Sequence, residues 1–187
     1  MLVPVKWLLC KSIPILCVLG ATLSIICPSW GQKRQFQFEQ FPAKVYEGPF
    51  KIPDGLRKDE QGEWLDELDH SVAPPKVGFA GEYYLPVQSC GTGCRYYLLL
   101  NLRTGARIPE IYMFNAGDPL PKTKDGHPYL TMLYYRPDSR LLIAEYHLDF
   151  DDPNKKETCR QRYFVLENGK LRPISKTFPF CTEERER

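Results

Sequence analysis

The stretch that decides the fold is residues 78–102, GFAGEYYLPVQSCGTGCRYYLLLNL. Two apolar runs flank a glycine-containing turn that is closed by Cys90 and Cys94. Three-residue hairpin loops commonly need one residue at positive φ, which glycine adopts without steric penalty. The two residues that close such a loop face each other with Cα atoms roughly 4.5–5.5 Å apart, which is within disulfide range. The stretch therefore predicts a disulfide-closed β-hairpin.

The second arm of this hairpin carries large apolar groups on both faces. Side chains of a strand alternate between its two faces. One face is formed by Cys94, Tyr96, Leu98, Leu100 and Leu102, and the other by Arg95, Tyr97, Leu99 and Asn101. Because neither face is polar at its middle, the pattern predicts a central strand that is covered on both sides.

The first 31 residues have the pattern of a secretory signal peptide. Lys6 and Lys11 precede an apolar run over residues 13–27, no acidic residue occurs, and the small residues Ser29 and Gly31 come just before Gln32. We predict cleavage near Gly31 and an exported protein, periplasmic or extracellular. The alternative is that the segment is retained as a membrane anchor, and a membrane association is expected only in that case.

The charge balance argues against nucleic acid as a partner. The chain of 187 residues has 25 basic and 23 acidic residues, and loss of Lys6 and Lys11 with the signal would leave 23 of each. Proteins that bind nucleic acid or anionic surfaces commonly carry an excess of basic residues. No nucleic-acid partner is therefore expected.

The cysteine count indicates two disulfides. Three of the seven cysteines lie in the predicted signal, which leaves Cys90, Cys94, Cys159 and Cys181. Four cysteines in an exported domain allow three connectivities. Proximity in sequence favours Cys90 with Cys94 and Cys159 with Cys181. Loop-closure entropy differs by only about 1 kcal/mol per ring among the pairings, so it does not choose between them.

Local patterns divide the remaining chain into an arm and a β-domain. Residues 32–58 carry spaced aromatics and prolines, which favours an extended arm whose aromatics pack on the core. Residues 59–187 are predicted to form an antiparallel β-domain that begins with a helix over 59–72. The helix is predicted because Asp59 can cap it and because one helical face is shared by Trp64, Leu65, Leu68 and Val72. Residues 108–114 are predicted to form a further strand.

Two further hairpins follow. Residues 129–135 and 141–148 flank a turn with Pro137, and residues 163–166 and 171–174 flank Asn168 and Gly169, a strong hairpin signal. The predicted fold class is mainly β: an antiparallel meander or sandwich of consecutive hairpins with one N-terminal helix, stapled by disulfides.

Five segments together resemble a family of small exported bacterial proteins of unassigned function: GFAGEYYLPV, SCGTGC, NLRTGARI, YYRPDSRLLIAE and RYFVLENGKLRPI. Members share NFAGxY, GCGxxC, DxxTG and SRLL motifs in this order, over roughly residues 78–174. This chain departs from them at Gly78, Ser89 and Asn101. The resemblance implies export and the β-fold, and it implies no catalytic residue.

Three groups of residues could carry function. The proline- and glycine-rich loop over residues 115–128 is the predicted partner-binding surface, through Lys122, Lys124, Asp125 and His127. A dense set of oxygen ligands could bind Ca²⁺, although it lacks the glycine of an EF-hand; it comprises Asp149, Asp151, Asp152 and Glu157. Glu145 and His147 fall on one face of a strand and could act as a base and its partner.

The leading functional prediction is an exported, non-enzymatic binding protein, for instance an inhibitor or immunity-type protein that engages an unidentified protein through the 115–128 loop. No catalytic residue and no cofactor is predicted, because no nucleophile elbow, phosphate loop or dinucleotide motif occurs. The alternatives are a hydrolase that uses Glu145 and His147, and an envelope protein stabilised by Ca²⁺. A redox role for the CGTGC turn is disfavoured, because it lacks the CxxC spacing at a helix N-terminus.

Overall fold

A computed structural model describes residues 36–89, 91, 93–150 and 152–182, all of which belong to one compact unit, Gln32–Arg187. The predicted signal peptide and its cleavage site lie outside the described residues. Within the described part, no helix has the length and apolar character needed to cross a membrane.

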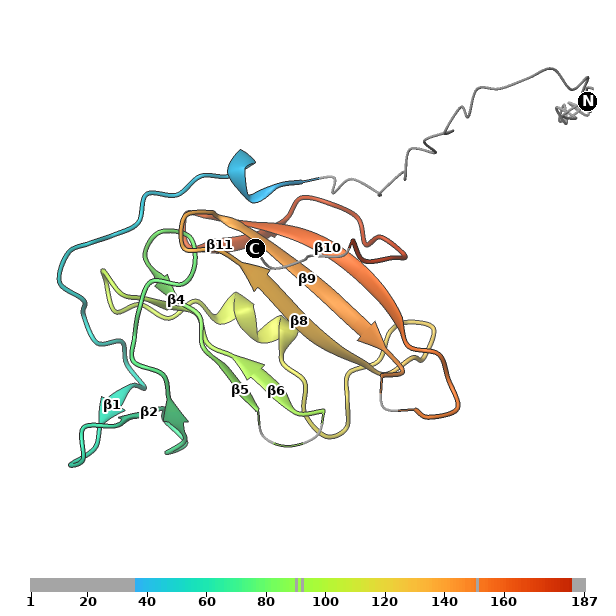
Figure 1. The fold of residues 1–187 in the computed structure, drawn as a ribbon, viewed down its shortest axis with the longest axis horizontal. Coiled ribbons are helices and arrows are strands. Elements are labelled where there is room, and N and C mark those ends of the chain that lie inside the picture. Colours follow the sequence, from blue (N-terminus) through green and yellow to red (C-terminus); the bar gives the residue numbers. More distant parts are fainter. Residues whose placement is uncertain (1–35, 90, 92, 151, 183–187) are drawn as a thin grey trace, which may run out of the picture. The chain divides into compact units, whose positions relative to one another are not determined.

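Four antiparallel strands form the main sheet (Figure 1), and they confirm the predicted meander. The order is β11–β10–β9–β8, with β8 at Tyr129–Tyr135, β9 at Leu141–Leu148, β10 at Thr158–Glu167 and β11 at Lys170–Pro173. The β10–β11 turn has Asn168 at φ 50° and Gly169 at φ 71°. Two successive residues at positive φ are what a type I′ hairpin turn requires, so this hairpin forms where the sequence predicts it.

The predicted central hairpin is present as two short strand pairs. Strand β4 (Tyr83–Tyr84) pairs with β7 (Leu100–Asn101), and β5 (Val87–Ser89) pairs with β6 (Arg95–Tyr97). Ser89 faces Arg95 in the last pair of this register. Cys94 is disulfide-bonded, whereas Cys90 lies outside the described residues. Gly91 and Gly93 both have positive φ, whereas the predicted turn needs only one such residue.

Burial on both faces of the segment that contains β6 and β7 is also confirmed. Tyr97 and Leu99 belong to the largest hydrophobic cluster, which joins this hairpin to Leu142, Ala144 and Phe164 of the main sheet. On the opposite face, Leu98, Leu100 and Leu102 form a second cluster with Leu56, Val72 and Tyr84. The hairpin therefore lies between the main sheet and the segment that precedes the hairpin.

The predicted helix over residues 59–72 is wrong. Three two-residue strands form a small antiparallel sheet there instead: β1 (Arg57–Lys58), β2 (Trp64–Leu65) and β3 (Ser71–Val72). The carboxylate of Asp66 accepts hydrogen bonds from the backbone N–H groups of Leu68 and His70. Such side-chain bonds to the local backbone compete with helix formation. Leu68, expected on the buried helix face, is 62 % exposed.

The strand predicted over residues 108–114 is also wrong, because a 3₁₀ helix, η2 (Pro109–Phe114), occupies this segment. Pro109 stands at the start of the helix, where its missing N–H costs nothing. Ile111 and Phe114 are buried in the main cluster, while Met113 points to solvent with 52 % of its surface exposed. The last residue of η2 is thus anchored in the core immediately before the 115–128 loop begins.

The outer face of the main sheet is covered by the two ends of the described chain. Phe38 in the short 3₁₀ helix η1 (Phe38–Gln40) packs with Leu141, Ile143 and Tyr163, in agreement with a packing role for the arm's aromatics. On the C-terminal side, Phe178 exchanges both backbone hydrogen bonds with Gln161 of β10. The disulfide Cys159–Cys181 then links the tail to the beginning of the same strand. This pairing is one of those that sequence proximity favours.

Candidate functional site

The loop over residues 115–128 is fixed at its root by the central hairpin. Ala116 and Arg95 exchange two backbone hydrogen bonds of 2.7 and 2.8 Å. The side chain of Asn115 accepts a hydrogen bond of 2.8 Å from the backbone N–H of Tyr97. Since Tyr97 is itself buried in the core, the first residues of the loop have a defined position.

The tip of the loop is a tight turn. Lys122 and Pro128 form an antiparallel bridge, and the backbone N–H of Thr123 donates to the carbonyl of His127. The N–H of Gly126 donates to the carbonyl of Thr123 at 3.0 Å, and Gly126 has φ of 88°. A type I turn followed by a residue at positive φ is a common three-residue hairpin connection, and glycine makes it without strain. The tip is thus a small β-hairpin.

Asp125 connects this tip to strand β10. Its two carboxylate oxygens accept hydrogen bonds from the two terminal nitrogens of Arg160, at 2.8 and 3.3 Å. Bidentate pairing of this kind fixes both distance and orientation. The Arg160 guanidinium, helped by Thr123, holds the pKa of the Asp125 carboxyl below its ordinary value.

His127 makes a second connection, to the end of β9. Its Nδ1 lies 2.6 Å from Oδ2 of Asp149, and the ammonium of Lys155 lies 3.1 Å from Oδ1 of the same carboxylate. The backbone N–H of Asp149 also donates to the carbonyl of Pro128. Burial opposes ionisation of Asp149, but hydrogen bonds from Lys155 and then His127 outweigh it, so the pKa of this buried carboxyl is lowered.

The ionised Asp125 should hold the tip more firmly near neutral pH than in acid. A carboxyl whose pKa is lower in the folded state stabilises that state above its ordinary pKa of about 3.9, and the effect is lost as the pH falls through the lower folded-state value. Amide-exchange protection of Gly126 and His127 should therefore be higher in the wild type than in Asp125→Asn at pH 6, and the two proteins should converge in acid. The groups that face this carboxylate are Arg160 and His127. An equal difference at both pH values would contradict this role of the ion pair.

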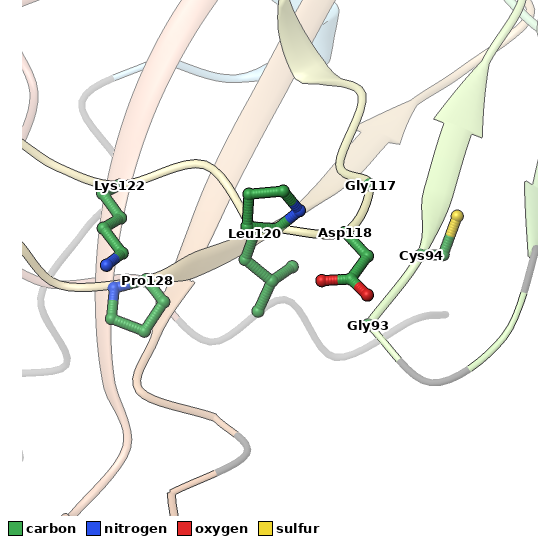
Figure 2. Close-up of a pocket in the computed structure, with 8 residues that line it drawn as sticks. Gly93, Cys94, Gly117, Asp118, Leu120, Lys122 and Pro128 are labelled. Atoms are coloured by element: carbon green, nitrogen blue, oxygen red, sulfur yellow. The ribbon is translucent and has the colours of Figure 1, made fainter.

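A hollow of about 380 Å³ opens between the loop and the cysteine turn. Figure 2 shows the Asp118 and Leu120 side chains extending into the same space, with Lys122 and Pro128 on one side and Cys94 on the other. The lining therefore combines apolar surface with one acidic and one basic group. A hollow of this size can receive an apolar side chain of a partner protein or a small ligand.

All four residues predicted to bind a partner contact solvent, and two of them also hold the loop. Lys122 and Lys124 are exposed. Asp125 and His127 instead pair with Arg160 and Asp149, so their first role is to position the tip. Sequence reasoning missed Arg160, because 35 positions separate it from Asp125 and only the sheet register brings them together.

No family model, curated protein or solved structure matches this chain. The resemblance to the exported bacterial family accordingly stays a prediction.

The residues predicted to bind Ca²⁺ do not share one position. Asp149 and Asp152 both pair with Lys155, whose ammonium lies 3.1 and 3.4 Å from their carboxylate oxygens. Glu157 instead pairs with His147 at 2.5 Å. Asp151 lies outside the described residues. A lysine ammonium thus takes the position between Asp149 and Asp152 that a cation would need.

Glu145 and His147 are neighbours, as predicted, but both have other partners. Oε1 of the buried Glu145 accepts a hydrogen bond of 3.0 Å from Gln161. Nδ1 of His147 faces Glu157, and its buried Nε2 lies 3.7 Å from Oε2 of Glu145 without a hydrogen bond. The Glu145 carboxylate, opposed by burial and assisted by Glu157, raises the pKa of His147.

Proposed function

We propose that this protein is an exported, non-enzymatic binding protein, of the inhibitor or immunity type, that engages a protein partner through the 115–128 loop. The observation that carries the proposal is the fixed tip: Asp125 and His127 bind it to the sheet while Lys122 and Lys124 remain exposed. The two lysines favour a partner with an acidic surface. The disulfide Cys159–Cys181 suits the oxidising conditions of an exported protein.

Pre-organisation is the physical reason to prefer this loop. Binding costs free energy when a loop must be ordered on association, and a loop already held in one conformation avoids most of that cost. The tip over residues 122–128 is held by the Asp125–Arg160 and His127–Asp149 pairs in addition to its own turn hydrogen bonds. The adjacent hollow, lined by Leu120 and Pro128, would receive an apolar side chain of the partner.

The surroundings of His147 also support a binding role over hydrolysis. A general base needs a neutral imidazole nitrogen that can accept a proton. His147 lies between two carboxylates, which raise its pKa and so lower the fraction of neutral ring that can accept a proton. Gln161 occupies one oxygen of Glu145, which would have to assist the histidine.

A capture experiment with charge-reversed variants tests the proposal. The immobilised protein is exposed to the exported proteins of its own source, and the retained proteins are identified by mass spectrometry. We expect one partner to be retained in stoichiometric amount by the wild type, and its retention to fall at least tenfold with Lys122→Glu plus Lys124→Glu.

The matched control is Lys170→Glu plus Arg172→Glu. Both residues are exposed on the β10–β11 hairpin, and the change in charge is identical. This variant should retain the partner as the wild type does. Equal retention by the two double variants, or no retained protein in a folded wild-type sample, would contradict the proposal.

A further inference from the structure

The disulfide at the start of β10 lies against a buried carboxylate. One carboxylate oxygen of Glu145 and the sulfur atoms of Cys159 and Cys181 all lie within 4.8 Å of one another. The two cysteine Cα atoms are 5.5 Å apart. Tetrahedral Zn²⁺ with bonds of 2.3 Å to sulfur needs the two sulfurs ~3.8 Å apart, which rotation of the freed cysteine side chains can supply.

A fourth donor, His147, lies beside Glu145. His147 is the direct cross-strand partner of Cys159, just as Glu145 is that of Gln161. The Nε2 atom of His147 is buried, makes no hydrogen bond and lies 3.7 Å from Oε2 of Glu145. Its other nitrogen, Nδ1, contacts the carboxylate of Glu157. A carboxylate on the second nitrogen is the usual support of a metal-bound histidine, because it fixes the orientation of the ring.

We propose that reduction of the Cys159–Cys181 disulfide creates a Zn²⁺ site from the two thiolates, Glu145 and His147. A dithiol reductant supplies two electrons and two protons: its own sulfurs become a disulfide, and the two cysteines become thiols. Binding of Zn²⁺ then releases both thiol protons to solvent, together with the proton on Nε2 of His147 where the ring is protonated. Two sulfurs, one imidazole nitrogen and one carboxylate oxygen form a donor set that suits Zn²⁺ over Ca²⁺ or Mg²⁺, which prefer oxygen alone.

The site and the disulfide exclude each other, because both use the same sulfur atoms. Under oxidising conditions the disulfide pins the tail to β10. Under reducing conditions the metal ion would take over that role, since it joins the tail, through Cys181, to β9 and β10. The inference is independent of the proposed loop function, because none of its four residues belongs to the 115–128 loop.

Cobalt substitution is the direct test. The full-length chain is reduced with a dithiol, freed of the reductant without oxygen, and titrated with Co²⁺, whose thiolate charge-transfer and visible bands report tetrahedral sulfur ligation. We expect one equivalent of Co²⁺ to produce these bands and Zn²⁺ to abolish them. His147→Gln and Glu145→Gln should each weaken binding at least about tenfold. The oxidised protein should show no bands.

Two variants assign the signal to this site. Cys90→Ser plus Cys94→Ser should keep the bands, whereas Cys159→Ser plus Cys181→Ser should lose them. As a second measurement, Zn²⁺ should raise the melting temperature of the reduced protein and leave that of the oxidised protein unchanged. The proposal is overturned if the bands survive loss of Cys159 and Cys181, or if His147→Gln binds Co²⁺ as the wild type does. It is also overturned if the reduced wild-type protein gives no bands, whether that protein is folded or unfolded.

Discussion

Replacement of Phe114 by alanine should lower the free energy of unfolding by about 4 kcal/mol, because it removes a large side chain from a closed core. Only 1 % of Phe114 is exposed, and its ring meets that of Phe164 edge to face with centroids 5.1 Å apart. It is also the last residue of η2, so it fixes the point from which the 115–128 loop starts. Urea unfolding measured by circular dichroism gives the change.

The neighbouring residue provides the control. Met113→Ala changes a side chain that is half-exposed on the same short helix, and the expected change is below about 0.5 kcal/mol. If both variants lose the same stability, η2 contributes through its own conformation and not through the anchoring of Phe114. If Phe114→Ala loses less than about 1 kcal/mol, the packing described for the main cluster is wrong.

Asp66→Ala should lower the free energy of unfolding by about 3 kcal/mol, although the residue is polar and lies in a segment of very short strands. Only 1 % of Asp66 is exposed. One oxygen accepts from the N–H groups of Leu68 and His70, and the other accepts from the hydroxyl of Tyr96 at 2.6 Å. Burial opposes ionisation, yet these hydrogen bonds outweigh it and lower the pKa of the carboxyl. Removal of the carboxylate leaves all three donors without this acceptor.

Asp69→Asn is the matched control, three positions further along the chain. Asp69 pairs with Arg57, but both side chains are largely exposed, and exposed pairs contribute less than about 1 kcal/mol. Asparagine also tolerates the positive φ of 62° at this position. Urea unfolding of both variants should therefore separate them clearly. A smaller loss for Asp66→Ala than for Asp69→Asn would show that the network around Asp66 does not hold this segment.

The parts of the fold that the sequence predicts correctly are those set by local chemistry. Asn168 and Gly169 can both adopt positive φ at low cost, so the β10–β11 turn follows from two adjacent residues. The alternating apolar residues around Tyr97 and Leu99 indicate two buried faces, and the structure has a separate cluster on each. In both cases the deciding interaction lies within a few residues or follows the strand period.

The errors arise where a competing local interaction outweighs a periodic pattern. Apolar residues at helical spacing over 59–72 were compatible with a helix, but the Asp66 carboxylate binds the backbone N–H groups that a helix would use. Pro109 removes one N–H donor from a segment that was expected to be a strand, and η2 begins there. A buried aspartate cannot be recognised from the sequence alone, because its burial depends on Tyr96, 30 positions away.

The candidate sites show the same division between local and long-range chemistry. The composition of the 115–128 loop indicates a surface loop, and the structure places Lys122, Lys124, Asp125 and His127 in the turn at its tip. The different roles of Lys124 and Asp125 depend on Arg160, which only the strand register brings close. The grouping of Glu145, Cys159 and Cys181 likewise requires the pairing of β9 with β10 and the return of the tail.

The central claim, that the tip of the 115–128 loop is the partner-binding surface, is tested most directly by site-specific photo-crosslinking. A photoreactive amino acid replaces Lys124 in one variant of the protein and Lys170 in a second variant. Both positions are exposed. They lie at opposite ends of the main sheet: position 124 precedes the end where Tyr129 pairs with Leu148, and position 170 is at the end where Glu167 pairs with Lys170. Irradiation in the native source should link position 124, and not position 170, to one partner protein. An adduct formed equally from both positions, or from position 170 alone, would contradict the account.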